Sequence, residues 1–281
     1  PQAQQAIDAA DERGVLVVAS MADEESKHAN LPAALEHTMP VNSVTQRKHL
    51  LGGQDGWMAL NGCTNWGPIT WVSMLSSSCS SEATGLSSGI AELIESAARD
   101  AGIARNLANP AGPGGNVLSA NELKQLFAAN ADDIDFGTPT ATDPANNYAR
   151  KCASCIDFFP TESFPSRKGW DQVHGFGRVN AYEAVRLVNA KRIPPEADIT
   201  SPLWFDVRGT SGSVAVTGRV AARFADSYGY RVEWAPGASP PAYPATDTWH
   251  VAATQSGLRS PRSGTLATLD LAQLAAALPG G

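Results

Sequence analysis

The sequence of 281 residues has few charged residues, few basic residues and no long apolar run. Charged residues make up 17% of it, and 21 Lys and Arg stand against 28 Asp and Glu, so the formal net charge is −7. This balance argues against a nucleic-acid or anionic-membrane surface, because such surfaces need clustered positive charge. No stretch approaches the roughly 18 apolar residues of a transmembrane helix, and we therefore expect no membrane segment.

The first residues also lack the pattern of a signal peptide, and the sequence has few cysteines. Residues 1–20 lack a basic segment followed by an apolar one, which is the pattern of a signal peptide. There are only four cysteines, and their even number allows two disulfides, which would indicate an oxidising compartment. Cys152 and Cys155 form a lone CxxC without the two further ligands that zinc needs. We therefore favour a local disulfide or inert thiols over a zinc site or a redox dithiol.

Apolar residues make up 43% of the chain, which is enough for a sizeable core. Helical spacing of apolar residues occurs at 3–13, 82–100, 119–129 and 181–188. Strands are expected at 15–19, 39–45 and 69–74. The first of these is a continuous apolar run, typical of a strand buried on both faces of a parallel sheet. The first part of the chain is therefore predicted to be an α/β domain with a mainly parallel sheet.

The composition changes at Pro194-Pro195, where we place a domain boundary between residues 1–193 and 194–281. Beyond it, alternating polar and apolar residues predict a β-sandwich with strands at 213–217, 220–224 and 230–234. The tryptophans of this part are Trp204, Trp234 and Trp249. They could line a carbohydrate or peptide groove, although aromatic residues spaced in this way are more typical of a sandwich core.

The segment from Cys79 to Ile94 places serines at the start of a helix that carries Gly85 and Gly89. A serine in the first turn of a helix lies beside unpaired N–H groups and the positive end of the helix dipole, where a developing oxyanion would be stabilised. The alternative is ordinary capping, because serines often precede helices for that reason. Each glycine costs about 1 kcal/mol of helix propensity, so we expect close packing at both positions.

Four segments together resemble the subtilases, the subtilisin-like serine peptidases. In the family's nucleophile motif, Gly-Thr-Ser, a glycine follows the serine by eight residues. Cys79-Ser80-Ser81 and Gly89 hold these places, so the resemblance assigns the nucleophile to Ser81. The second similar segment is 14–25, the strand leading to the oxyanion asparagine. The third combines the proline turn at 31–33 with the strand that follows it at 41–45. The fourth is 169–185, the closing motif with His174-Gly-Phe-Gly-Arg-Val-Asn-Ala181.

The resemblance covers about residues 1–190 of the chain. It implies a three-layer subtilisin-like α/β domain that acts as a serine endopeptidase on a protein or peptide substrate. The low charge and the even number of cysteines agree with secretion, which the resemblance also implies. Peptide specificity and oligomeric state are left open.

The family uses an Asp and a His upstream of its serine, and neither motif is present in this sequence. His28, His37 and His49 precede Ser81 but lie in other segments, without the expected Gly-Thr neighbours. Because a serine without a positioned base is a poor nucleophile, we expect little or no activity from this chain alone. Residues 3–13 look like the second half of a helix, so we expect a fragment, with the Asp and His on upstream sequence and an incomplete sandwich at its end.

Asp23 stands where the family has its oxyanion asparagine. Asparagine donates an N–H to the developing charge, whereas an ionised aspartate would repel it. Asp23 is therefore protonated, directed elsewhere or part of an altered site. Glu82 adds a second carboxylate, for which pairing with the helix N-terminus is the simple explanation. Gly85 and Leu86 replace the family's Pro and His, and these changes leave an alternative open: a catalytically degenerate scaffold that binds proteins or surfaces.

The resemblance also gives Cys63 and Cys79 a role, since a disulfide between them would pin the loop that carries Ser81; two free thiols are the alternative. Subtilases often bind calcium, and Asp132-Asp-Ile-Asp135 is an acidic cluster. The cluster matches no ligand-loop spacing, so we interpret it as a solvated turn and expect no cofactor.

Overall fold

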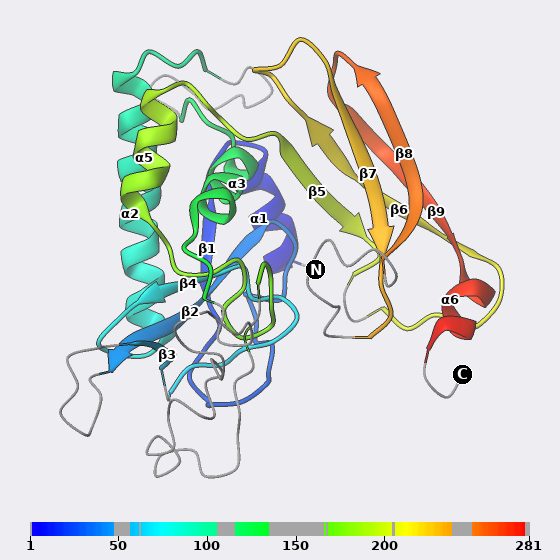
Figure 1. Cartoon of the computed structure of the whole chain (residues 1–281), viewed down its shortest axis with the longest axis horizontal. Helices are drawn as coiled ribbons and strands as arrows, with labels where there is room; N and C mark the ends of the chain where they lie inside the picture. The colour runs from blue at the N-terminus through cyan, green and yellow to red at the C-terminus, as the bar shows by residue number, and fades with distance from the viewer. Residues whose placement is uncertain are drawn as a thin grey trace, which may run out of the picture. The chain divides into compact units, whose positions relative to one another are not determined.

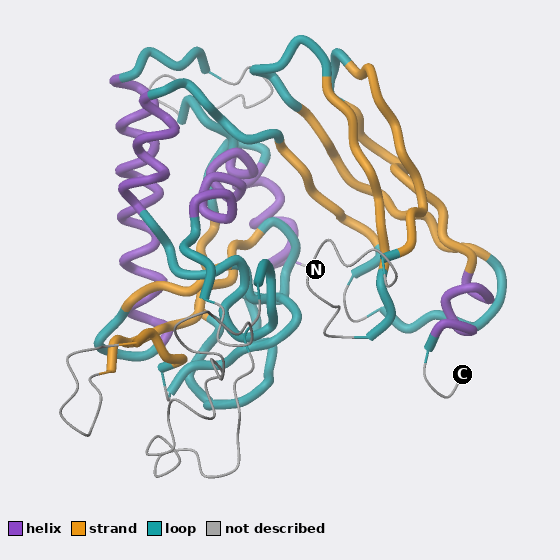
Figure 2. The backbone as a smooth tube through the Cα atoms, viewed as in Figure 1, coloured by secondary structure: helices purple, strands orange, loops and turns teal. Residues whose placement is uncertain are grey.

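A computed structural model of the protein describes residues 2–47, 57–61, 63–105, 116–134, 166, 168–203, 206–237 and 249–278. The chain divides into two compact units, residues 1–191 and residues 192–281, which we call unit 1 and unit 2 (Figure 1). Unit 1 combines helices and strands, whereas unit 2 consists mainly of strands (Figure 2). Along these described stretches, no helix is long and apolar enough to cross a membrane.

A four-stranded sheet lies in unit 1, and one strand, β2, pairs with the three others. The strands are β1 (Val17–Ser20), β2 (Thr38–Arg47), β3 (Trp57–Leu60) and β4 (Val72–Leu75). β2 runs parallel to β1, with Val18 opposite Met39, and parallel to β4, with Val41 opposite Val72. β3 is antiparallel to β2, and the sequence pattern does not predict it. The expected α/β fold with a mainly parallel sheet is confirmed.

The helices of unit 1 are α1 (Gln2–Asp11), α2 (Ser80–Asp100), α3 (Ala120–Asn130) and α5 (Ala181–Asn189). α2 packs against β1, β2 and β4 and also against α5. The buried residues in its middle are mostly small and recur at helical spacing: Ala83, Ser87, Ala91, Ile94 and Ala98. Small side chains on this face allow the helix axis to approach the sheet closely.

Two local predictions about these helices have opposite outcomes. α3 begins with the expected capping box: the Ser119 hydroxyl accepts the Glu122 N–H at 2.9 Å, and the Glu122 carboxylate accepts the Ser119 N–H at 2.9 Å. The expected close packing at Gly85 and Gly89 is wrong for the part of the chain that the structure describes. A Cβ at either glycine would have no neighbouring atom within 4 Å, because both lie on the exposed face of α2.

The glycine-rich segment near the end of unit 1 runs against β4 and the turn that follows α3. Gly175 has a φ of 61°, and a Cβ there would lie 2.2 Å from the carbonyl oxygen of Trp71. A Cβ at Gly177 would lie 2.3 Å from the carbonyl oxygen of Asp132. The Phe176 N–H donates to the Trp71 oxygen at 2.8 Å, which fixes the approach. Only glycine fits at both positions, because any side chain would displace the neighbouring backbone.

Asn42 is fully buried in β2 and connects the sheet to two loops. Its Nδ2 donates to the carbonyl oxygens of Val173, at 2.6 Å, and Asn65, at 3.3 Å. Its Oδ1 accepts the hydroxyl of Ser73 on β4 at 2.5 Å. A buried amide is stable only with such partners, so Asn42 holds both loops against the end of the sheet that leads to α2.

The described residues of unit 2 form two antiparallel sheets. Its elements are β5 (Glu196–Ser201), β6 (Ser213–Ala221), β7 (Tyr228–Trp234), β8 (His250–Leu258), β9 (Arg262–Asp270) and α6 (Leu271–Ala277). β6 pairs with β5 and β9, and β7 pairs with β8. The hydroxyl of Tyr230 on β7 donates to the carbonyl of Leu266 on β9 at 3.1 Å, which ties one sheet to the other.

The structure corrects one detail of the strand prediction in unit 2. The expected strands 213–217 and 220–224 belong to a single strand, β6, which ends at Ala221. The glycine between them, Gly218, does not make a turn. A Cβ there would lie 2.0 Å from the carbonyl oxygen of Asp198, so the glycine allows β5 to lie close to β6.

The tryptophans of unit 2 are partly buried where the structure describes them. Trp234 stacks on His250 with ring centroids 4.5 Å apart. Trp249 is also partly buried, and Trp204 lies outside the described residues. Their roles in a core or in a ligand groove stay predictions.

Candidate active site

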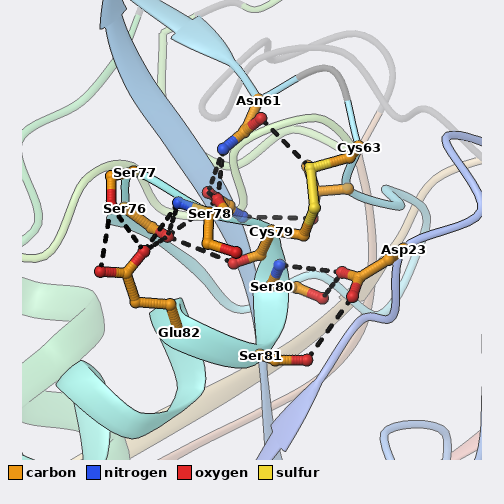
Figure 3. Close-up of a disulfide and its surroundings, with 12 residues drawn as sticks. Asp23, Asn61, Cys63, Ser76, Ser77, Ser78, Cys79, Ser80, Ser81 and Glu82 are labelled. Carbon is orange, nitrogen blue, oxygen red and sulfur yellow. Dashed lines mark hydrogen bonds between the residues drawn. A yellow bond between two sulfur atoms is a disulfide. The ribbon is translucent and has the colours of Figure 1, made fainter.

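Ser81 lies in the first turn of α2, and its side chain is exposed (Figure 3). β4 ends at Leu75, and the turn 76–79 leads from it into the helix. The N–H groups in the first turn of a helix have no carbonyl of the same helix to bind, and they form the positive end of its dipole. The predicted nucleophile therefore lies where negative charge is favoured.

A disulfide joins Cys63 to Cys79, the residue directly before α2. The two Cα atoms are 5.4 Å apart, within the ordinary range for a disulfide. This is the pairing that the resemblance implies, and it fixes the chain two residues before Ser81 (Figure 3). Cys152 and Cys155 lie outside the described residues.

The carboxylate of Asp23 lies at the start of α2. Its Oδ1 accepts the Ser80 N–H at 2.9 Å and the Ser80 hydroxyl at 2.6 Å, and its Oδ2 is 3.5 Å from the Ser81 hydroxyl oxygen. The residue in the capping position, Cys79, makes no side-chain capping bond. Asp23 therefore caps α2 in its place, with a carboxylate that also suits the helix dipole.

A strained residue directs Asp23 toward the helix. Ala22 has a φ of 68°, in the left-handed region that costs a non-glycine residue about 1–2 kcal/mol. Its N–H donates to the Ser20 hydroxyl at 3.0 Å, and its carbonyl accepts the Asn65 N–H at 3.0 Å and the Ser80 hydroxyl at 2.9 Å. These bonds stabilise a sharp turn after β1, and the turn brings residue 23 to the first turn of α2.

Glu82 binds the turn that precedes the helix. Its Oε2 accepts the Ser76 hydroxyl at 2.7 Å, the Ser78 N–H at 2.7 Å and the Ser77 hydroxyl at 3.1 Å. The hydrogen bond from Ser76 and then the one from the Ser78 backbone hold the pKa of Glu82 below its usual value. Figure 3 shows its carboxylate on the side of the helix start away from Asp23, so it orders the turn and leaves Ser81 free of it.

Asn61 supports the same turn from β3. Its side-chain amide donates to the carbonyl oxygen of Ser78 and, at 3.1 Å, to the hydroxyl of Ser43 on β2. The Ser43 hydroxyl donates to the Ser78 carbonyl at 3.1 Å. Sequence reasoning missed this part of the site, although the position of Asn61 two residues before Cys63 was a usable signal.

The described histidines of unit 1 are His28, His37 and His174. His37 Nδ1 is 2.8 Å from the carboxylate of Asp8 on α1. His174 is fully buried, and burial lowers its pKa to about 3, so its imidazole is neutral. Within the described ranges no histidine, His28 included, forms a hydrogen bond with Ser81; His49 lies outside them. Among the described residues of unit 1, Ser81 therefore lies near Asp23 and the disulfide but has no histidine base as a partner.

Two aspartates of the acidic cluster after α3, Asp132 and Asp133, accept hydrogen bonds from the segment 169–180. Asp132 pairs with the Arg178 guanidinium and accepts the Asn180 amide at 2.9 Å. Burial raises the pKa of Asp132, but the hydrogen bonds and charge of these partners outweigh burial and hold the pKa below its usual value. Asp133 accepts the Gly169 N–H at 2.8 Å, and Asp135 lies outside the described residues. Over the described ranges, no group of three or more His, Cys, Asp or Glu could hold a metal ion.

No protein-family model matches the sequence, and no curated protein matches it. Among solved structures, the chain is similar to a lanthipeptide protease, with a TM-score of 0.41 and 16% identity over 66% of this chain and 54% of that one. It is similar to the prenylagaramide maturation protease PagA, with a TM-score of 0.40 and 18% identity over 66% of this chain and 55% of that one.

A further similarity is to the subtilase cytotoxin SubAB, with a TM-score of 0.38 and 14% identity over 67% of this chain and 55% of that one. The chain therefore spans about half the length of the solved structures that it matches. At these values the similarity identifies neither an activity nor a substrate for this chain.

Proposed function

We propose that this chain carries the nucleophile of a subtilisin-like serine endopeptidase and that Ser81 is that nucleophile. One observation supports this most: Ser81 is an exposed hydroxyl in the first turn of α2, and a disulfide fixes the residue two positions before it. Ser80, its neighbour, is buried and hydrogen-bonded to Asp23. Of these two serines, only Ser81 is therefore open to a substrate.

The chemistry requires a histidine base, and none of the described residues of unit 1 supplies one at Ser81. The Ser81 oxygen attacks the carbonyl carbon of a peptide, its proton passes to a histidine, and the carbonyl π electrons move onto oxygen to form an oxyanion. The oxyanion collapses, the C–N bond breaks, and the histidine gives the proton to the departing amine. Water then hydrolyses the acyl-enzyme by the same steps. We place this histidine and its partner aspartate on upstream sequence, so the chain alone has little or no activity.

Protein or peptide substrates and secretion belong to the same proposal. The Cys63–Cys79 disulfide supports secretion, because such bonds persist in oxidising compartments. Unit 2 would then be an accessory β-sandwich domain of the peptidase.

One observation favours a second candidate, a degenerate scaffold that binds proteins or surfaces. The carboxylate of Asp23 lies beside Ser81, close to where negative charge would develop during acylation. An ionised carboxylate there opposes that charge, whereas an amide would donate a hydrogen bond to it.

A fluorophosphonate probe tests the proposal, because it reacts covalently with activated serines. The full-length protein that carries this chain is treated with the probe, and the label is mapped by mass spectrometry. We expect labelling of Ser81 and its loss in Ser81→Ala. The matched control is Ser88→Ala, which removes another exposed serine of α2 and should leave labelling intact. No labelling at any pH, or equal labelling of Ser81→Ala, would favour the scaffold.

A further inference from the structure

Cys79 occupies the position from which a side chain normally caps a helix, yet it makes no such bond. Its backbone is extended, with a φ of −81° and a ψ of −159°, as is usual for a capping residue. A side chain in this position accepts the N–H of the second or third helical residue, here Ser81 or Glu82. The Cys79 sulfur is instead bonded to Cys63, so residue 79 leaves both N–H groups uncapped (Figure 3).

The backbone N–H of Ser81 belongs to the residue that we propose as the nucleophile. A hydroxyl that attacks a carbonyl generates an oxyanion, and N–H groups at the start of a helix stabilise such a charge. Asp23 accepts the N–H one residue earlier, that of Ser80, at 2.9 Å. In the described part of the chain, no side chain accepts the N–H of Ser81. The disulfide thus keeps a donor open beside the attacking hydroxyl.

Reduction of the disulfide gives Cys79 the acceptor atom that it lacks. A thiolate of a dithiol attacks the Cys63 sulfur, a mixed disulfide forms there, and Cys79 leaves as a thiolate. The second thiol of the reductant, on losing its proton, attacks the mixed disulfide and releases Cys63, which takes up a proton from water. The positive end of a helix stabilises a thiolate beside it. In the capping position this anion would accept the Ser81 N–H and oppose an oxyanion.

The two cysteines lie in backbone segments that hydrogen bonds hold without help from the disulfide. Asn61, two residues before Cys63, donates its N–H to the Ser43 carbonyl at 2.9 Å. Ser78, directly before Cys79, accepts the Ser43 hydroxyl at 3.1 Å. Ser43 of β2 therefore holds both segments close together. Both cysteines are also partly exposed, so a small thiol can reach them and the bond can open and close in the folded protein.

We propose that the Cys63–Cys79 disulfide is a redox switch: the oxidised form leaves the Ser81 site open, and in the reduced form Cys79 caps α2 and closes it. The switch rests on the proposed function of Ser81. The serine would be unreactive in a reducing compartment and become reactive on oxidation. A disulfide that only braced the turn 76–79 would behave differently, because the loss of either cysteine would then have the same effect.

The test compares the wild-type full-length protein with Cys63→Ala and Cys79→Ala. Both variants lose the disulfide, but only Cys63→Ala keeps a sulfur in the capping position. The rate of fluorophosphonate labelling of Ser81 is measured at neutral pH with and without a dithiol reductant, with circular dichroism as the check of folding. We expect reduced wild type and Cys63→Ala to react about 100-fold more slowly than oxidised wild type, the effect of losing one oxyanion donor.

Cys79→Ala has neither the disulfide nor the sulfur cap. It should react at least about 10-fold faster than Cys63→Ala, because its Ser81 N–H stays open. The reductant should not change its rate, which also controls for effects through Cys152 and Cys155. If a variant does not fold, the thiols of reduced wild type are blocked with methyl methanethiosulfonate instead. Labelling should then recover, because a blocked sulfur is no longer an anionic acceptor.

Three results would overturn the inference and leave Ser81 as the nucleophile. The first is equal labelling of oxidised and reduced wild type. The second is equally slow labelling of Cys63→Ala and Cys79→Ala while both are folded, which would make the disulfide a brace. The third is no recovery after the thiols of reduced wild type are blocked. Failure of oxidised wild type to react at any pH would overturn the proposed function itself, and this inference with it.

Discussion

The Oδ1 atom of Asp23 accepts the N–H of Ser80 at 2.9 Å, so a residue 57 positions earlier in the chain caps α2. Helices are usually capped by the residue directly before them. Here that residue is Cys79, whose sulfur is bonded to Cys63. The disulfide fixes the chain that enters α2, and the carboxylate of Asp23 accepts the first free N–H of the helix.

The first prediction concerns this cap. Asp23→Ala should lower the free energy of unfolding of the chain by about 1 kcal/mol, because the Ser80 N–H loses its acceptor, while the Ser80 hydroxyl keeps the Ala22 carbonyl. Asp23→Asn should cost less, since its amide oxygen can take the place of Oδ1. Urea unfolding followed by circular dichroism gives both values. Equal midpoints for wild type and Asp23→Ala would show that the contact contributes nothing to stability.

Local features of the fold could be predicted from the sequence. The capping box of α3 needs only Ser119 and Glu122, three residues apart, so the pattern contains the whole interaction. β1 overlaps a predicted strand because its apolar residues are consecutive, and β4 overlaps the strand predicted at 69–74. The expectation of close packing at Gly85 and Gly89 was wrong because a glycine in a sequence indicates a missing side chain but not whether a neighbouring residue fills the space.

Some contacts of the candidate site could not be predicted from the sequence. Asp23 and Ser81 stand out through their places in a family pattern, but the bond from Ser80 to Asp23 depends on how β1 and α2 come together. The turn at Ala22 is equally invisible, because alanine gives no signal of a left-handed conformation. Contacts of this kind join residues far apart in sequence, and a single sequence does not show which distant residues come into contact.

A second prediction compares two glycines with different surroundings. Gly175→Ala should lower the free energy of unfolding by more than about 3 kcal/mol, because its Cβ would lie 2.2 Å from the Trp71 carbonyl oxygen at a φ of 61°. Gly85→Ala is the matched control on the exposed face of α2, where a Cβ meets no atom within 4 Å. It should raise stability by about 0.5–1 kcal/mol through helix propensity. Urea midpoints measure both, and a loss of stability in Gly85→Ala would contradict the open space at that position.

The last prediction concerns Glu82 and pH. Its folded pKa lies below the ordinary 4.5, so its hydrogen bonds to Ser76 and Ser78 favour the ionised form. Above pH 4.5 both folded and unfolded states are ionised, and the contribution to stability is fully present. As the pH falls, the unfolded state takes up its proton first, and the contribution disappears as the pH passes through the folded pKa.

Glu82→Gln should therefore lower the urea midpoint at about pH 7, and the difference from wild type should shrink toward about pH 3. The matched control is Glu92→Gln, which removes the same charge from an exposed position of the same helix. A constant difference between wild type and Glu82→Gln across this range would mean that the turn 76–79 does not depend on the ionised carboxylate. A difference that shrinks toward acid for Glu82→Gln, but not for Glu92→Gln, would assign the effect to the surroundings of Glu82 at the start of α2 rather than to the loss of one negative charge from the helix.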